Sequence, residues 1–157
     1  MEIRFARENE LERVNVLRKQ VNDLHVEGKP DVFKPGFNDD LRDHISNIWN
    51  DPEQEIVVAD VDGIICGFAV VHHIYKAENP FMYERDFIDV DEFCVDESFR
   101  RQGVATEIIA FILLLLIRRL PVTKRLFVNV IQIRMQFYQI LIILIMMIST
   151  TKEENQI

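Results

Sequence analysis

The chain has few residues suited to cross-linking or metal binding. Its 157 residues include two cysteines and four histidines. Cys66 and Cys94 lie within apolar runs and do not have the CxxC spacing of a metal site. This pattern predicts two reduced core residues and no metal centre. The segment Met1–Arg7 is charged and lacks an apolar stretch, so we expect no signal peptide and a reducing cytoplasm.

Long apolar runs are also absent. Ile108–Ile117 and Ile140–Ile148 are uninterrupted apolar segments of ten and nine residues. A membrane-spanning helix needs about 20 such residues. Both segments are therefore predicted to be buried elements rather than membrane spans.

Basic residues are too few for a typical nucleic-acid-binding protein. The chain carries 18 Lys and Arg against 26 Asp and Glu, a net charge of −8. This balance argues against nucleic acid as a partner and is compatible with a cationic substrate such as an amine. The length predicts one domain spanning residues 1–157, and 48% hydrophobic residues are enough for a globular core.

The first 50 residues predict a strand followed by two helices. Glu2–Ala6 is typical of a strand, and Glu8–His25 and Leu41–Trp49 are typical of amphipathic helices. Glycine and prolines between residues 28 and 35 predict a loop. Asn38–Asp40 supplies the N-cap candidates for the second helix. The apolar face of the first helix consists of Leu11, Val14, Leu17, Val21 and Leu24.

The middle of the chain predicts three strands. Ile56–Ala59 and Ile64–Tyr75 flank the pair Asp62-Gly63, which is typical of a type I′ hairpin turn. Gly67, inside the second strand, predicts a bulge or a close contact. A third strand is predicted over Asp86–Val95. Regular alternation would place Phe87, Asp89, Asp91, Phe93 and Val95 on one face and the residues between them on the other.

The last third of the chain departs from this regular pattern. A helix is predicted over Val104–Arg119 and a strand over Arg125–Val130. No Asp or Glu occurs from Ile108 to Thr151, so residues 1–107 are well patterned and residues 108–157 are atypical. Two explanations remain open. Either this segment packs against a partner subunit, for example in a homodimer, or a shift of reading frame has replaced the selected sequence.

The segment Phe93–Thr106 carries the main chemical signal. It predicts a strand end, a polar turn and a helix that begins near Gly103. A helix N-terminus exposes unpaired backbone N–H groups and partial positive charge, which makes it an anion site. Arg100 and Arg101 add charge suited to phosphate oxygens. A plain strand–helix connection is the alternative.

The order of residues in this segment resembles a known signature. Arg100-x-x-Gly103-x-Ala105 is similar to the [Arg/Gln]-x-x-Gly-x-[Gly/Ala] motif of the GNAT N-acetyltransferase superfamily. The run from Phe93 to Arg100 resembles strand 4 of that family and the loop after it. The resemblance covers about three-quarters of the chain. It implies an α/β (α+β) fold with a mixed, mostly antiparallel central sheet flanked by helices, in the order β-α-α-β-β-β-α-β-α. The C-terminal strands of the family are not recognisable here.

The resemblance also implies acetyl-CoA as cosubstrate. The backbone of Phe93, Cys94 and Val95 would run beside the pantetheine arm and hold the thioester carbonyl. The backbone N–H groups from Arg101 to Thr106 would bind the pyrophosphate. The remaining cofactor-binding candidates are Arg100, Arg101, Gln102, Gly103, Val104, Ala105 and Thr106.

An amine acceptor must lose a proton, and in many members a strand 4 carboxylate removes it. Glu92 is the first candidate for this base and Asp91 the second; as sequence neighbours they are predicted to face opposite sides. Tyr138 resembles the family tyrosine that protonates the leaving thiolate, although the stretch from Asn129 is shorter than usual. A solvated strand carboxylate and a core aromatic are the respective alternatives.

Other side chains are assigned more weakly. Of His72 and His73 at a strand end, one can face the acceptor cleft, although ordinary sheet-end residues are the alternative. His25 and His44 are expected to be solvated on their helices. The loop between the first two helices falls where family members shape the acceptor pocket. Its candidates are Asp31, Phe33 and Phe37.

The predicted function is an acetyl-CoA-dependent N-acetyltransferase acting on a primary amine of a small molecule or peptide. Two alternatives stay open because of the atypical last third. One is a catalytically impaired CoA-binding module, which would bind CoA without acetyl transfer. The other is a hydrophobic interaction protein, which would form a stable oligomer without binding CoA.

Overall fold

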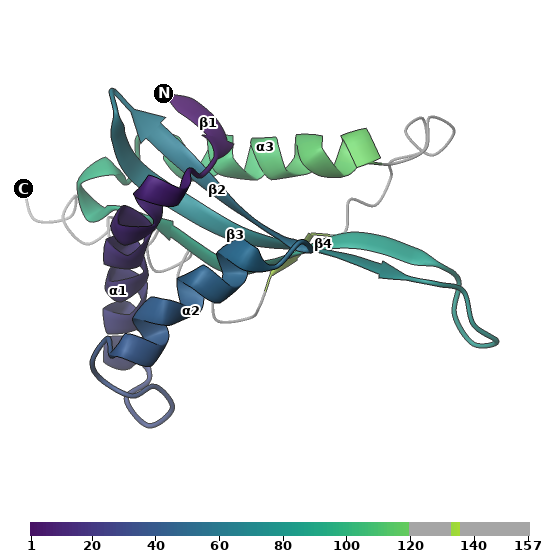
Figure 1. Cartoon of the computed structure of the whole chain (residues 1–157), viewed down its shortest axis with the longest axis horizontal. Helices are drawn as coiled ribbons and strands as arrows, with labels where there is room; N and C mark the ends of the chain where they lie inside the picture. Colours follow the sequence, from purple (N-terminus) through teal and green to yellow (C-terminus); the bar gives the residue numbers. More distant parts are fainter. Residues whose placement is uncertain (120–132, 136–157) are drawn as a thin grey trace, which may run out of the picture.

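The structure, a computed structural model, describes residues 1–119 and 133–135 (Figure 1). Its elements in chain order are β1 (Glu2–Phe5), the 3-10 helix η1 (Glu8–Glu10), α1 (Leu11–Gly28), α2 (Asp39–Asn50), β2 (Gln54–Val61), β3 (Ile64–Lys76), β4 (Arg85–Val95), the 3-10 helix η2 (Glu97–Phe99), α3 (Val104–Arg119) and β5 (Ile133–Met135). This sequence of elements confirms the predicted order as far as α3. The predicted strand Arg125–Val130 and the final helix lie outside the described residues, and β5 was not predicted.

The five strands form one mixed sheet in the order β1-β2-β3-β4-β5. The first four are antiparallel, and β5 runs parallel to β4 beside Ile88–Val90. The predicted hairpin turn is confirmed, because Asp62 and Gly63 both have positive φ, 53° and 84°. Beyond the body of the sheet, β3 and β4 continue as a long two-stranded arm (Figure 1).

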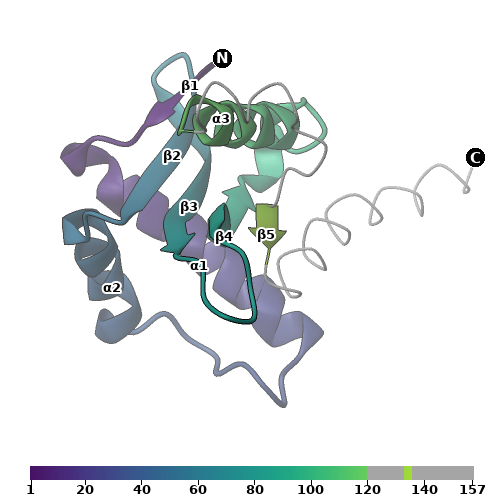
Figure 2. The same cartoon turned by 90° about the vertical axis from the view of Figure 1, so that its right-hand side faces the viewer.

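The helices cover the sheet from two sides, with α3 on one face and α1 and α2 on the other (Figure 2). Each face has its own apolar core. The α3 face buries Val57, Ala59, Cys66, Ala69, Val71, Ile88, Val90, Phe93 and Val95 against Val104, Ile108, Ile112 and Leu116. The opposite face buries Ile56, Val58, Ile65, Phe68, Val70 and Cys94 against Val14, Leu17, Ile45 and Ile48. Helix α3 is sixteen residues long, and the described part of the chain contains no helix that could cross a bilayer.

Local sequence signals set the helix boundaries. The side chain of Asn38 accepts a hydrogen bond from the N–H of Leu41 at 3.0 Å, so Asn38 is the N-cap of α2. Helix α1 runs to Gly28, three residues beyond the predicted end at His25, and begins after the turn η1. Glycine ends the helix here rather than breaking it earlier.

Gly67 makes the predicted close contact between the sheet and α3. A Cβ atom at this position would lie 3.1 Å from Cys94 O and 3.1 Å from side-chain atoms of Val104 and Ile108. The β2–β3 register also shifts beside it, between Ala59 and Asp60. A side chain at Gly67 would push α3 away from the strand end that it covers.

A bulge in β4 overturns the predicted alternation of its faces. Val70 pairs with Glu92 but Val71 pairs with Val90, so Asp91 is the extra residue. Val90 and Phe93 consequently share the α3-side core, which regular alternation forbids. The prediction that Asp91 and Glu92 face opposite sides was therefore wrong, as their contacts below show.

Candidate active site

The predicted anion-binding turn is formed as a loop that opens into α3. After η2, the backbone takes positive φ at Arg101 (65°) and at Gly103 (83°). The first helical hydrogen bond of α3 runs from the N–H of Glu107 to the carbonyl of Gly103 at 3.1 Å. The N–H groups of residues 103–106 therefore precede the helical ladder and are not used by it.

The space above these N–H groups is open. A Cβ atom at Gly103 would meet no atom within 4 Å, and the side chain of Thr106 is exposed. Glycine is required at residue 103 by its positive φ, and its lack of a side chain leaves the helix end uncovered. Together with the partial positive charge of the helix end, the loop provides a cradle for a phosphate group.

Asp96 ties this loop to α1. Its carboxylate accepts hydrogen bonds from the N–H and Oγ of Ser98, from Arg13 Nη2 at 2.6 Å and from Gln20 Nε2 at 3.4 Å. Arg13 also donates from Nε to the carbonyl of Ile65 at 2.9 Å. Burial opposes ionisation of the carboxyl, but the hydrogen bonds from Ser98 and Arg13 outweigh it and hold the pKa of Asp96 at about 2.

In the described part of the chain, the end of β4 presents an unpaired backbone edge beside the loop. The N–H of Asp96 donates to the carbonyl of Cys66 on β3 at 2.8 Å. Because hydrogen-bonded pairs alternate in an antiparallel ladder, Cys94 also bonds toward β3, and Phe93 and Val95 turn their N–H and C=O groups to the other edge. Within the described residues, β5 pairs with β4 at Ile88–Val90 and leaves that edge open. Arg100 Nε reaches Val95 O at 3.3 Å.

The buried cysteine on this strand is not a nucleophile. Burial raises the pKa of the Cys94 thiol to about 12, so the thiolate is scarce near neutral pH. Cys66 is also buried and free, and burial raises its pKa. The chemistry of the site must therefore come from other groups.

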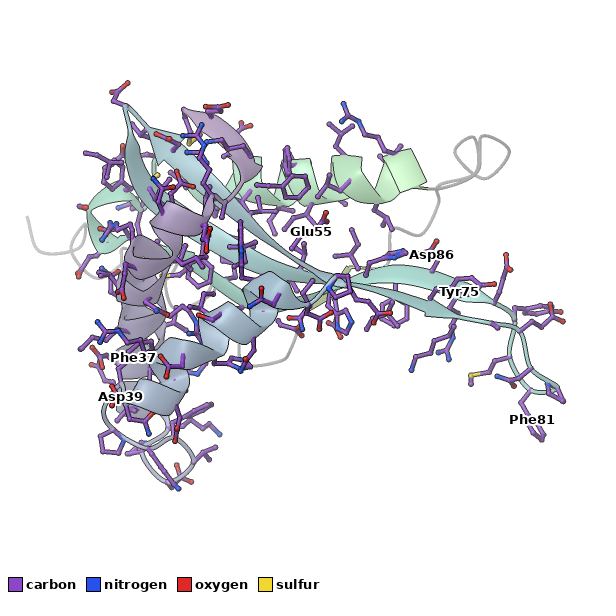
Figure 3. The ribbon with its side chains drawn as sticks, viewed as in Figure 1. Phe37, Asp39, Glu55, Tyr75, Phe81 and Asp86 are labelled. Atoms are coloured by element: carbon purple, nitrogen blue, oxygen red, sulfur yellow. The ribbon has the colours of Figure 1, made fainter. Side chains whose placement is uncertain are left out.

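Glu92 is held by a buried arginine on the α1 face of the sheet. Arg18 Nε and Nη2 donate to the two carboxylate oxygens at 2.7 and 2.9 Å. The Arg18 side chain is 5% exposed and also donates to Asn15 Oδ1 and the carbonyl of Leu41. Phe37 covers the guanidinium, with its ring centre 5.7 Å away, and lies where the α1–α2 loop meets the helices (Figure 3). Both oxygens of Glu92 are thus engaged.

Asp91 reaches the same side of the sheet as Glu92 but has no such partner among the described side chains. Its Oδ2 lies 4.0 Å from Nδ1 of His72, which follows Phe68 and Val70 on the α1 face of β3. Burial and the neighbouring Asp89 raise the pKa of Asp91. The bulge therefore places both carboxylates on the α1 face, with Glu92 bound by Arg18 and Asp91 without a comparable partner in the described residues.

His25 is not solvated, contrary to the prediction. Its ring packs against Phe33 with a centroid separation of 4.5 Å, and its Nε2 is buried with no hydrogen-bond partner in the described part of the chain. Burial lowers the pKa of His25. His44 is exposed, as expected, and Asp31 is exposed on the loop. Phe33 therefore contacts His25 and Phe37 contacts Arg18, and the role of Asp31, Phe33 and Phe37 in an acceptor pocket stays a prediction.

Two residues of the site were missed in the sequence. Arg18 and His25 lie on the stripe Leu11, Val14, Arg18, Val21 and His25, which advances by alternating steps of three and four. A polar residue on such a stripe faces the core, and that signal could have found both. Tyr138 lies outside the described residues. In those residues, His, Cys, Asp and Glu form no group of three that could hold a metal ion.

Solved structures with similar folds are acetyltransferases or share their architecture. The BH1408 protein from Bacillus halodurans, in a tetramutant form, is 21% identical with a TM-score of 0.74, covering 98% of this chain and 89% of its own. An acetyltransferase from Vibrio fischeri is 22% identical with a TM-score of 0.58, covering 86% and 96%. AAC(6')-Iy, in complex with the bisubstrate analogue CoA-S-monomethyl-acetylneamine, is 26% identical with a TM-score of 0.53, covering 71% and 67%.

No curated protein sequence matches the chain. The model of the acetyltransferase (GNAT) family matches residues 18–138, which include the α1 face, the bulged strand, the anion-binding loop and α3. The match spans more than half of the chain, and the observed order of strands and helices is the one that the Arg100-x-x-Gly103-x-Ala105 signature implied. This chain belongs to the GNAT family of acetyltransferases.

Proposed function

We propose that the protein transfers the acetyl group of acetyl-CoA to a primary amine of a small molecule or peptide. One observation carries this proposal. Four backbone N–H groups at the start of α3 lie next to an edge of β4 that no described strand pairs with beyond Val90, so that a phosphate cradle adjoins a strand that can pair with an extended chain. CoA joins these two features chemically, because its pyrophosphate continues into the amide-containing pantetheine arm.

In this proposal the N–H groups of residues 103–106 bind the pyrophosphate, and Arg100 and Arg101 contribute charge. The pantetheine amides pair with the N–H and C=O groups of Phe93 and with the N–H of Val95, because the carbonyl of Val95 already accepts a hydrogen bond from Arg100 Nε. One of those N–H groups polarises the thioester carbonyl and stabilises the oxyanion of the tetrahedral intermediate. Positioning of thioester and amine supplies much of the remaining acceleration.

The contacts favour Asp91 over Glu92 as the base. Both oxygens of Glu92 are occupied by Arg18, whereas Asp91 is partly buried and its pKa is raised toward the working range of a general base. Asp91 takes one proton from the ammonium, the free amine attacks the carbonyl carbon, and the C–S bond breaks to release CoA thiolate. The nitrogen also loses a second proton, which the departing thiolate takes up to leave as CoA thiol. The assignment of Glu92 as base stays a prediction, and so does the protonation of the thiolate by Tyr138.

Paired variants separate the two carboxylates. Asp91→Asn is expected to lower kcat by about a hundredfold, the low end of the usual contribution of a general base. Asp86→Asn is the matched control, because Asp86 is on the same strand with a similarly exposed carboxylate but pairs with His73 on the arm (Figure 3). Loss of activity in Glu92→Gln alone, with Asp91→Asn unaffected, would restore Glu92 as the base.

The acceptor side suits a cationic amine. Asp89, Asp91 and Glu92 lie on neighbouring positions of β4, and Oδ1 of Asp89 is buried without a hydrogen-bond partner in the described residues. An ammonium group can supply the missing donor. The aminoglycoside N-acetyltransferase AAC(6')-Iy has a related fold, which supports an amine of this kind as substrate. The proposed compartment is the cytoplasm, on the sequence grounds given above.

The experiment is a turnover screen with acetyl-CoA and a panel of polyamines, aminoglycosides, amino acids and lysine peptides. Release of free CoA thiol reports the reaction. Thiol release that depends on a particular amine supports the proposal. If acetyl-CoA raises the melting temperature but every amine fails, the protein is a CoA-binding module without transferase activity.

A further inference from the structure

His72 lies between two carboxylates from different parts of the chain. Its Nδ1 is 4.0 Å from Asp91 Oδ2, and its Nε2 is 3.5 Å from Glu53 Oε2. The side chains of His72 and Asp91 are 29% and 32% exposed, whereas that of Glu53 is 73% exposed. The three groups thus lead from the partly buried base to solvent, with one ring nitrogen directed toward each carboxylate.

The proposed reaction requires such a path. The ammonium loses two protons in each turnover: one leaves on the CoA thiol, and the other stays on Asp91, which must release it before the next cycle. Among the described side chains, the charged groups around His72 are Asp51 and Glu53, which precede β2, and Asp89 and Asp91 on β4, and the backbone of Arg134 on β5 is in register with Asp89. The groups nearest its two ring nitrogens, Asp91 and Glu53, are carboxylates that can give and accept a proton. Imidazole suits this task because it accepts at one nitrogen and donates from the other.

We propose that His72 relays the proton from Asp91 to Glu53 and the solvent. The inference rests on the proposed acetyl transfer. Protonated Asp91 gives its proton to Nδ1 of His72, and the imidazolium loses a proton from Nε2 to Glu53 or to water. This restores the Asp91 carboxylate and the neutral imidazole, so the cycle closes without another reactant. The 4.0 Å separation between Asp91 Oδ2 and His72 Nδ1 is longer than a hydrogen bond, so the transfer requires the two side chains to approach or a water molecule to bridge them.

The neighbouring histidine gives a matched control. His73 is also 29% exposed, but its Nε2 pairs with Asp86 on the arm. Its backbone N–H donates to the carbonyl of Glu53 at 3.0 Å, a bond that a side-chain substitution leaves in place. Substitution of His73 therefore perturbs a similar amount of structure without breaking the path from Asp91.

The test compares His72→Ala and His73→Ala in the acetyl-CoA assay with an accepted amine, with added imidazole. We expect His72→Ala to lower kcat by about tenfold or more with an unchanged KM for acetyl-CoA, and imidazole to restore the rate in proportion to its concentration. His73→Ala should retain the wild-type kcat, and added imidazole should not change its rate. His72→Gln, which preserves bulk and polarity, should show the same loss, and this keeps the test valid if the alanine variant folds poorly.

The relay is overturned if the wild-type enzyme turns over while both His72 variants keep its kcat. It is equally overturned if His73→Ala loses as much activity as His72→Ala, or if imidazole restores nothing. Failure of the wild-type protein to acetylate any amine overturns the proposed function, and the relay with it. The two failures are thus distinguished by the activity of the wild-type protein.

Discussion

The substitution Asp96→Asn tests the hydrogen bonds that hold the anion-binding loop against α1. Folding lowers the pKa of this carboxyl from its usual 3.8 to about 2. At about 1.4 kcal/mol per pKa unit, this is worth about 2 kcal/mol. A lowered pKa stabilises the fold above the unfolded-state value, and the contribution is lost as the pH falls from 3.8 toward 2. At neutral pH the variant should melt about 4–8 °C lower.

Urea unfolding followed by circular dichroism at neutral pH and near pH 3 measures this difference, which should shrink in acid. Asp60→Asn is the matched control, because Asp60 also pairs with an arginine, Arg4, at 2.7 Å but holds β1 rather than the loop. Calorimetry should show weaker CoA binding for Asp96→Asn alone. The reasoning is refuted if Asp96→Asn is as stable as the wild type at neutral pH, or if both variants weaken CoA binding equally.

Three further substitutions test the packing and the site. Gly103→Ala should weaken CoA binding and lower the free energy of unfolding by about 1 kcal/mol, because φ is +83° there. Gly36→Ala is the control: φ is +96° with equally open space, so the loss of stability should be the same, but a titration should show unchanged CoA binding. Gly67→Ala should destabilise by about 1–3 kcal/mol in urea unfolding, because its Cβ would lie 3.1 Å from a backbone carbonyl; unchanged stability would contradict the packing. Arg18→Met should lower the free energy of unfolding by about 3 kcal/mol, and adding Glu92→Leu should recover at least about 1 kcal/mol of it in a double-mutant cycle. Strictly additive losses would contradict an energetic coupling between Arg18 and Glu92.

The elements of the first 119 residues could be predicted because each has a local cause. Asn38 caps α2, Asp62-Gly63 takes the positive φ angles of its turn, and α3 begins and ends where the pattern placed it. The anion-binding loop was also predictable, because a strand, a positive-φ glycine and a helix start are adjacent in sequence. Features of this kind depend on residues that are adjacent in the sequence, so the sequence alone is enough to predict them.

The acceptor side was less predictable because it depends on pairing between distant segments. The bulge at Asp91 arises from the register of β3 against β4, and no residue type in β4 predicts it. It brings Asp91 and Glu92 to one face, which a regular alternation separates. The clamp by Arg18 needs α1 packed across the same strand, although its place on the apolar stripe of α1 was visible in the sequence.

The central claim is that the start of α3 and the free edge of β4 together bind CoA. Isothermal titration calorimetry of the wild-type protein with CoA, and separately with pantetheine, tests it most directly. The structure predicts one CoA per chain and much weaker binding of pantetheine, which lacks the pyrophosphate held by the N–H groups of residues 103–106. Equal binding of the two compounds, or no binding of CoA by the folded protein, would contradict the account.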